Sequence, residues 1–123
     1  MIYQSKGEIR KAIHHLKVVL GIATPSSWND VLFWAHYRLA HLFRDGGRFG
    51  DAQAHTEHAK SLAVNKYHLG GVIEMQAIIW YKQHRLEEAK SEALRAADVF
   101  GKLGATEDVE RCRELLRVIR EER

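Results

Sequence analysis

Hydrophobic residues recur every three or four positions along most of the chain. In residues 8–22 this stripe consists of Ile9, Ala12, Ile13, Leu16, Val19 and Leu20. The spacing places apolar side chains on one face of a helix, whereas a half-buried strand would alternate at every second residue. Further helices are predicted over residues 28–43, 48–64, 69–82, 86–102 and 107–120. The chain is therefore predicted to be all-α, with five or six helices and short links.

Residues that break or cap helices separate these segments. Pro25 disfavours helical backbone at the residue before it, and Ser27 is a favourable N-cap for the helix that follows. Gly46 and Gly47 end that helix, because glycine adopts the backbone conformation of a helix C-terminus without strain. Thr106 is predicted to cap the last helix.

An aromatic residue, a turn residue and a small residue recur with the same spacing in three places. The sets are Tyr3, Gly7 and Ala12; Phe43, Gly47 and Ala52; and Trp80, His84 and Ala89, followed seven residues later by Val19, Ala59 or Ala96. Two antiparallel helices cross closely only where a side chain is small, and an aromatic on the partner helix fills the adjacent space. The alanines recur at intervals of roughly 40 residues, which indicates a helical repeat.

These anchors resemble the tetratricopeptide repeat (TPR). One unit reads Ala40, Phe43, Gly47, Phe49, Ala52 and Ala59, and the next reads Ala77, Trp80, Leu86, Ala89 and Ala96. The segments "LFWAHYRLAHLFRD" and "MQAIIWYKQHRLEEAKSEALRA" are similar to TPR arrays of fungal signalling NTPases of the NACHT or NB-ARC type, although the glycine-rich phosphate loop of such NTPases is absent. The interval exceeds the usual period of about 34 residues, and His84 replaces the turn glycine.

The resemblance implies antiparallel helix pairs stacked as a right-handed solenoid, with about two and a half repeats and a capping helix. The single domain 1–123 would comprise a partial repeat (1–25), two repeats (26–66 and 67–103) and the cap (104–123). Only residues 2–5 remain of a first helix, so we expect a piece of a longer array. Its exposed apolar surface would favour a homodimer or a domain-swapped assembly.

The resemblance also implies a non-catalytic scaffold that binds a protein or peptide segment in a concave groove lined by the first helix of each pair. The groove residues would be Trp34, Tyr37, Arg38, His41, Arg44, Glu74, Met75, Ile78, Tyr81 and Lys82. The alternative for these residues is packing between repeats, with Trp34 and Ile78 in the core. The alternative function is a self-associating structural module of a larger signalling protein.

Composition narrows the class of partner. The 19 basic and 16 acidic residues are interspersed rather than gathered in a basic stripe, which argues against nucleic-acid binding. No stretch of about 18 apolar residues exists to span a membrane. The single cysteine cannot form an intrachain disulfide, and no export signal is evident, so a cytoplasmic protein is expected.

The sequence assembles no catalytic or metal site. His55 and His58 share a helix face, but His36 and His41 do not, and zinc needs three or four converging ligands. Glu87 and Glu88 fit the first turn of a helix, where its dipole favours acidic residues. We therefore expect no catalytic residues, no metal and no cofactor.

Overall fold

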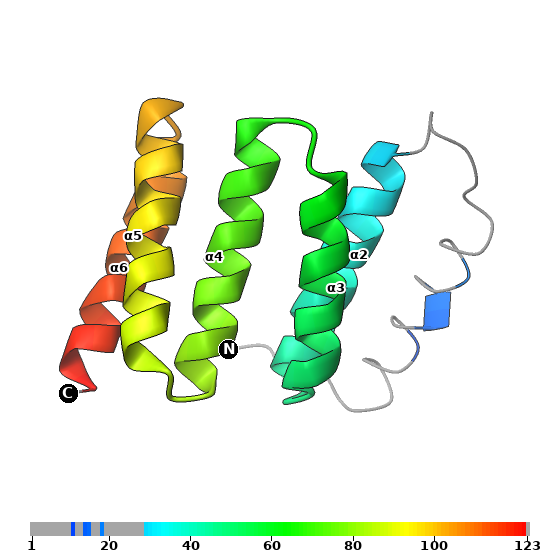
Figure 1. Ribbon diagram of the computed structural model, residues 1–123, viewed down its shortest axis with the longest axis horizontal. Helices are drawn as coiled ribbons and strands as arrows, with labels where there is room; N and C mark the ends of the chain where they lie inside the picture. The colour runs from blue at the N-terminus through cyan, green and yellow to red at the C-terminus, as the bar shows by residue number, and fades with distance from the viewer. Residues whose placement is uncertain (1–10, 12–13, 16–17, 19–28, 123) are drawn as a thin grey trace. The chain divides into compact units, whose positions relative to one another are not determined.

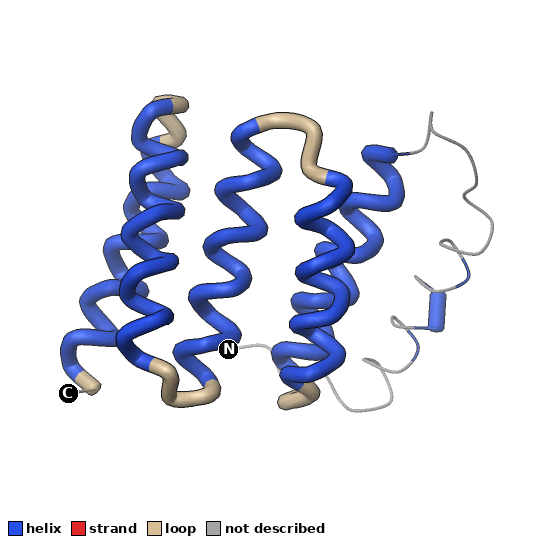
Figure 2. The backbone as a smooth tube through the Cα atoms, viewed as in Figure 1, coloured by secondary structure: helices blue, strands red, loops and turns tan. Residues whose placement is uncertain are grey.

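The computed structural model describes residues 11, 14–15, 18 and 29–122, which are drawn in colour in Figure 1. These residues contain helices and turns and no strand (Figure 2). The long helices are α2 (Asn29–Asp45), α3 (Phe49–Leu62), α4 (Lys66–Lys82), α5 (Leu86–Lys102) and α6 (Thr106–Glu121). The all-α prediction is thereby confirmed, whereas Tyr3, Gly7, Ala12 and the expected partial repeat lie outside the described residues.

The chain divides into two compact units, Met1–Leu62 and Ala63–Arg123. Unit 1 contains α2 and α3, and unit 2 contains α4, α5 and α6. The division falls close to the junction predicted between the two repeats. The stacking of the helix pairs into a solenoid stays a prediction.

In unit 1, α2 and α3 pack against each other as an antiparallel hairpin. The hairpin has a small-residue crossing, because Ala40 on α2 and Ala52 and Ala59 on α3 are completely buried. Phe33 and Phe43 supply the large buried rings on α2. The burial of these residues agrees with the predicted pairing of small and aromatic residues, whose contact stays a prediction.

In unit 2, α5 packs between α4 and α6 in sequence order, with additional contacts between α4 and α6. Ile73, Ala96, Phe100 and Cys112 form its buried cluster. A Cβ atom placed on Gly70 would lie only 2.7 Å from Cε1 of Phe100, so α4 approaches this ring at a position where only glycine fits without adjustment.

The three tight turns share one backbone form. The middle residue of each has positive φ, namely Gly47 (79°), His84 (62°) and Gly104 (71°). In each turn the next N–H group donates to the carbonyl of an aromatic residue, with N···O distances of 2.8 Å from Arg48 to Phe43, 2.8 Å from Arg85 to Trp80 and 3.0 Å from Ala105 to Phe100. The third example, between α5 and α6, was not found in the sequence.

This recurrence changes what the spacing means. The hydrogen bond that closes the turn fixes the number of residues between the aromatic residue and the turn residue. The same spacing is therefore expected in any helix hairpin with this type of turn. Arg48 and Arg85 add a side-chain contact, since each guanidinium lies over the aromatic ring whose carbonyl its own backbone binds. The pattern alone therefore identifies hairpins and does not locate a repeat boundary.

Two predicted helix starts are wrong. α4 begins at Lys66 rather than at residue 69, because the Asn65 side chain accepts a hydrogen bond from the backbone N–H of His68 at 2.8 Å and caps the helix. Thr106 is not the N-cap of α6. Ala105 holds that position without a side-chain cap, and the Thr106 hydroxyl donates instead to the carbonyl of Gly104.

Within the ranges that the structure describes, no helix combines the length and the apolar character needed to cross a bilayer.

Candidate functional site

The groove residues predicted on α2 share one face of that helix, which we call the α2 surface. It consists of Trp34, Tyr37, Arg38, His41 and Arg44, each of which lies three or four residues from another member of the set. The Trp34 side chain is 47% exposed, so it does not belong to the core of the described residues. Arg38 is also exposed, and Tyr37 and His41 are half-buried.

A buried phenylalanine supports the exposed indole. The Phe33 ring packs edge-to-face against Trp34 at 5.0 Å between ring centroids and is stacked with Tyr37 at 5.9 Å. Trp34 and Tyr37 also meet edge-to-face at 5.7 Å. Because Phe33 is 1% exposed, the two surface rings rest on a fixed part of the core. Aromatic anchors held in this way lose little conformational freedom on binding a partner.

Polar contacts fix the other end of the α2 surface. Arg44 donates from Nη2 to Nδ1 of His41 at 3.0 Å, and Nε2 of His41 lies 3.1 Å from the Asp45 carboxylate. Arg44 itself contacts Asp45 at 3.1 Å. Burial lowers the pKa of His41, and the charge of Arg44 lowers it further, which outweighs the opposite effect of Asp45. The neutral imidazole therefore accepts at Nδ1 and donates at Nε2.

The groove residues predicted on α4 divide into buried and exposed positions. Met75 and Glu74 are only 2% and 4% exposed, so neither lines an open surface, and this part of the prediction needs correction. Ile78 and Tyr81 are half-buried, and Lys82 is exposed. The reason for the error is that α4 is apolar around most of its circumference, so no single face can be identified as the inner one.

Glu74 has a structural partner within unit 2. Its carboxylate accepts two hydrogen bonds from Arg111 on α6, at 2.6 Å from Nε and 2.7 Å from Nη2, and Arg111 also binds Asp108. At the C-terminal end of α4, the hydroxyl of Tyr81 donates to Glu122 at 3.2 Å. These contacts connect α4 to α6. Glu74 and Tyr81 therefore stabilise unit 2 directly.

A histidine cluster on the α2–α3 hairpin was missed in the sequence. Nδ1 of His36 lies 2.9 Å from Nδ1 of His55, and the His36 ring stacks on His58 at 4.8 Å. The Phe43 ring is stacked with His55 at 5.4 Å between ring centroids. Burial, followed by the charges of His55 and His58, lowers the pKa of His36 to about 4. The sequence did contain one indication of this cluster. His36 and His58 lie equally far along the chain from Gly47 at the turn, so a hairpin brings these two residues side by side.

Histidines are common metal ligands, but these three imidazoles do not form a metal site. Among the residues whose positions are described, no group of three or more histidine, cysteine, aspartate or glutamate side chains has a geometry that could hold a metal ion. The cluster is therefore a set of three imidazole rings in mutual contact on the α2–α3 hairpin, in which burial and the neighbouring rings disfavour the charged form of His36.

Comparison of the chain with protein-family models, with curated proteins and with solved structures found no match. The resemblance to the TPR family rests on the residues quoted above and stays a prediction.

Proposed function

We propose that this protein is a non-catalytic interaction scaffold that binds a protein or peptide segment on the α2 surface. The observation that carries the proposal is the exposed Trp34 ring, supported from beneath by a buried Phe33 and flanked by Tyr37 and Arg38. Tryptophan, tyrosine and arginine are the residue types that contribute most to protein interfaces. In the solenoid that the TPR resemblance implies, this surface is one wall of the concave groove.

The fixed polar contacts beside the rings support the same function. Arg44, His41 and Asp45 satisfy one another, so the basic end of the α2 surface is already ordered before a partner arrives. Ordering side chains in advance reduces the entropy lost on binding. A peptide with an apolar side chain for the indole and a carboxylate for exposed Arg38 fits this surface.

The single cysteine gives no support to an enzymatic role. Cys112 is buried, and burial, with a further contribution from Glu74, raises its pKa to about 12. A thiol with this pKa is protonated at neutral pH, whereas nucleophilic cysteines act as thiolates.

Selection from a displayed peptide library tests the proposal. Peptides enriched on the wild-type chain are measured by calorimetry against Trp34→Ala/Tyr37→Ala and against Tyr67→Ala. Tyr67 is a matched control, because its ring is 46% exposed and lies on α4 in unit 2. We expect the double variant to weaken binding at least tenfold, as for interface hot spots, and the control to leave it unchanged.

Two results would overturn the proposal. One is a set of enriched peptides that bind the double variant as tightly as the wild type. The other is a stable dimer in light scattering that the Trp34→Ala/Tyr37→Ala variant abolishes, because the α2 surface would then be a self-association surface. Thermal melting of each variant shows whether it is folded.

A further inference from the structure

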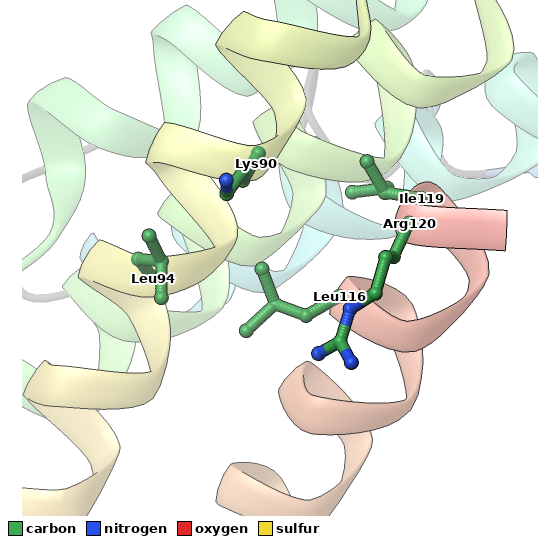
Figure 3. A pocket seen from close by; sticks show the side chains of 5 residues that line it. All are labelled: Lys90, Leu94, Leu116, Ile119 and Arg120. Carbon is green, nitrogen blue, oxygen red and sulfur yellow. The ribbon is translucent and has the colours of Figure 1, made fainter. Parts of the chain in front are cut away.

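A cleft of about 140 Å³ lies between α5 and α6 in unit 2 (Figure 3). Lys90 and Leu94 line it from α5, and Leu116, Ile119 and Arg120 line it from α6. This cleft lies on different helices and in a different unit from the α2 surface. It is therefore independent of the function proposed above.

The apolar part of the cleft has the size of one large side chain. Ile119 is buried at its base, Leu116 extends from α6 toward α5, and Leu94 is 51% exposed at its edge (Figure 3). Apolar cavities of roughly 150 Å³ accept a benzene-sized group. A single leucine or phenylalanine side chain of a partner thus fills this space and removes the apolar surface of Leu94 from water.

The charged part of the cleft lacks its counterions. The other described arginines of α6 are engaged: Arg111 binds Glu74 and Asp108, Arg113 binds Glu110, and Arg117 binds Glu114 and Glu121. By contrast, the structure pairs neither Lys90 nor Arg120 with any carboxylate of the described chain, and no acidic residue lines the cleft. A ligand that complements these two cations therefore carries negative charge.

Lys90 and Arg120 are attached to the backbone on the same side of Leu94 and Leu116. Lys90 precedes Leu94 by one turn on α5, and Arg120 follows Leu116 by one turn on α6. Because the two helices are antiparallel, both residues leave the backbone on the side farther from the turn at Gly104, and the Arg120 side chain extends back beside Leu116 (Figure 3). A ligand that places acidic groups one turn from its apolar anchor can therefore approach both long side chains. A helix does this with residues three and four positions from the anchor.

We propose that this cleft binds an acidic amphipathic helix of a protein partner, which inserts one leucine or phenylalanine and presents two carboxylates one turn away to Lys90 and Arg120. The apolar anchor supplies affinity, and the carboxylates fix the direction of the helix.

The test uses the full chain and three synthetic alanine-based peptides of about 16 residues, a length at which such sequences begin to form helix. The first peptide has one leucine, with glutamates three and four residues before it. The second has lysines in place of these glutamates, and the third has alanine in place of the leucine. Methyl NMR signals of Leu94, Leu116 and Ile119 report binding at this cleft even when the affinity is weak.

We expect the first peptide to shift these three methyl signals and the other two peptides to bind at least tenfold more weakly. Lys90→Glu/Arg120→Glu should reverse the preference between the glutamate and lysine peptides. The matched control is Lys102→Glu/Arg113→Glu, which changes the net charge equally at two exposed residues outside the cleft. This control should keep the wild-type preference at physiological salt.

Leu94→Ser provides a second arm, because a half-exposed side chain can be replaced with little effect on folding. It should weaken binding of the glutamate peptide at least tenfold, while Trp34→Ala/Tyr37→Ala should not. The proposal is overturned if the glutamate and lysine peptides bind equally or if no methyl signal of the cleft shifts at millimolar peptide. It is also overturned if the chain forms a dimer that Leu94→Ser dissociates, because the occupant is then a second copy.

Discussion

Gly70→Ala tests whether α4 and α5 approach each other as closely as the structure shows. The added Cβ would lie 2.7, 2.9 and 3.1 Å from three atoms of the Phe100 ring. Phe100 is 1% exposed and packs among Ile73, Ala96 and Cys112, so the ring cannot swing away without disturbing the core. The substitution therefore forces either the ring or the helix to move.

The magnitude follows from two opposing effects. Overpacking by one methyl group in a filled core costs about 1–3 kcal/mol. Replacing glycine by alanine in a helix contributes about 1 kcal/mol of stability in the opposite direction. We expect a net loss of about 0–2 kcal/mol in the free energy of unfolding, and each kcal/mol lost lowers the melting temperature of a small domain by roughly 4–8 °C.

Gly101→Ala is the matched control on the same hairpin. A Cβ at Gly101 would meet nothing within 4 Å, so the helix preference should act alone and raise stability by up to about 1 kcal/mol. Urea unfolding of both variants, followed by far-ultraviolet circular dichroism, measures the difference. If Gly70→Ala were at least as stable as Gly101→Ala, the close approach of α4 to Phe100 would be refuted.

Other substitutions test the turns, the buried ion pair and the histidine cluster. His84→Gly should raise the free energy of unfolding, measured in urea, by about 1 kcal/mol. Of the three turn residues with positive φ, His84 is the one that is not glycine, and a side chain is strained in this conformation. A decrease in the free energy of unfolding would contradict this. Glu74→Gln should cost about 1–3 kcal/mol by removing the charged acceptor of Arg111, and a neutral result would show that the pair adds nothing. The folded pKa of His36, about 4, lies below its unfolded value of 6.5, so the unfolded chain binds more protons between these values. Stability should therefore be complete above pH 6.5 and fall by about 1 kcal/mol toward pH 4, after allowance for solvent screening, and His36→Gln should flatten this part of the pH profile.

Hydrophobic periodicity was sufficient to predict the helices, because each buries one face against its neighbour. The predicted segment 86–102 coincides with α5, whose apolar stripe is narrow and well defined. α4 was predicted less well. Its apolar residues surround the helix, so the sequence could not show that Glu74 and Met75 are buried, and the N-cap at Asn65 was overlooked.

Contacts between helices were the part that the sequence could not supply. The ion pair joins Glu74, the one acidic residue of the largely apolar α4, with Arg111, which is far away in the chain and is one of several arginines of α6. The stacking of His36 on His58 depends on the register of the α2–α3 hairpin. By contrast, the exposure of Trp34 and Arg38 on α2 agrees with the positions expected from the TPR register, while their role in a groove stays a prediction.

The most direct test of the central claim is NMR of the three tryptophan indole N–H groups during titration with a library-selected peptide. The chain contains Trp28, Trp34 and Trp80, and Trp34 lies on the α2 surface. Binding as proposed should shift the Trp34 indole signal together with the backbone signals of Tyr37 and Arg38. Saturating peptide that leaves the Trp34 signal in place, while signals elsewhere move, would contradict it.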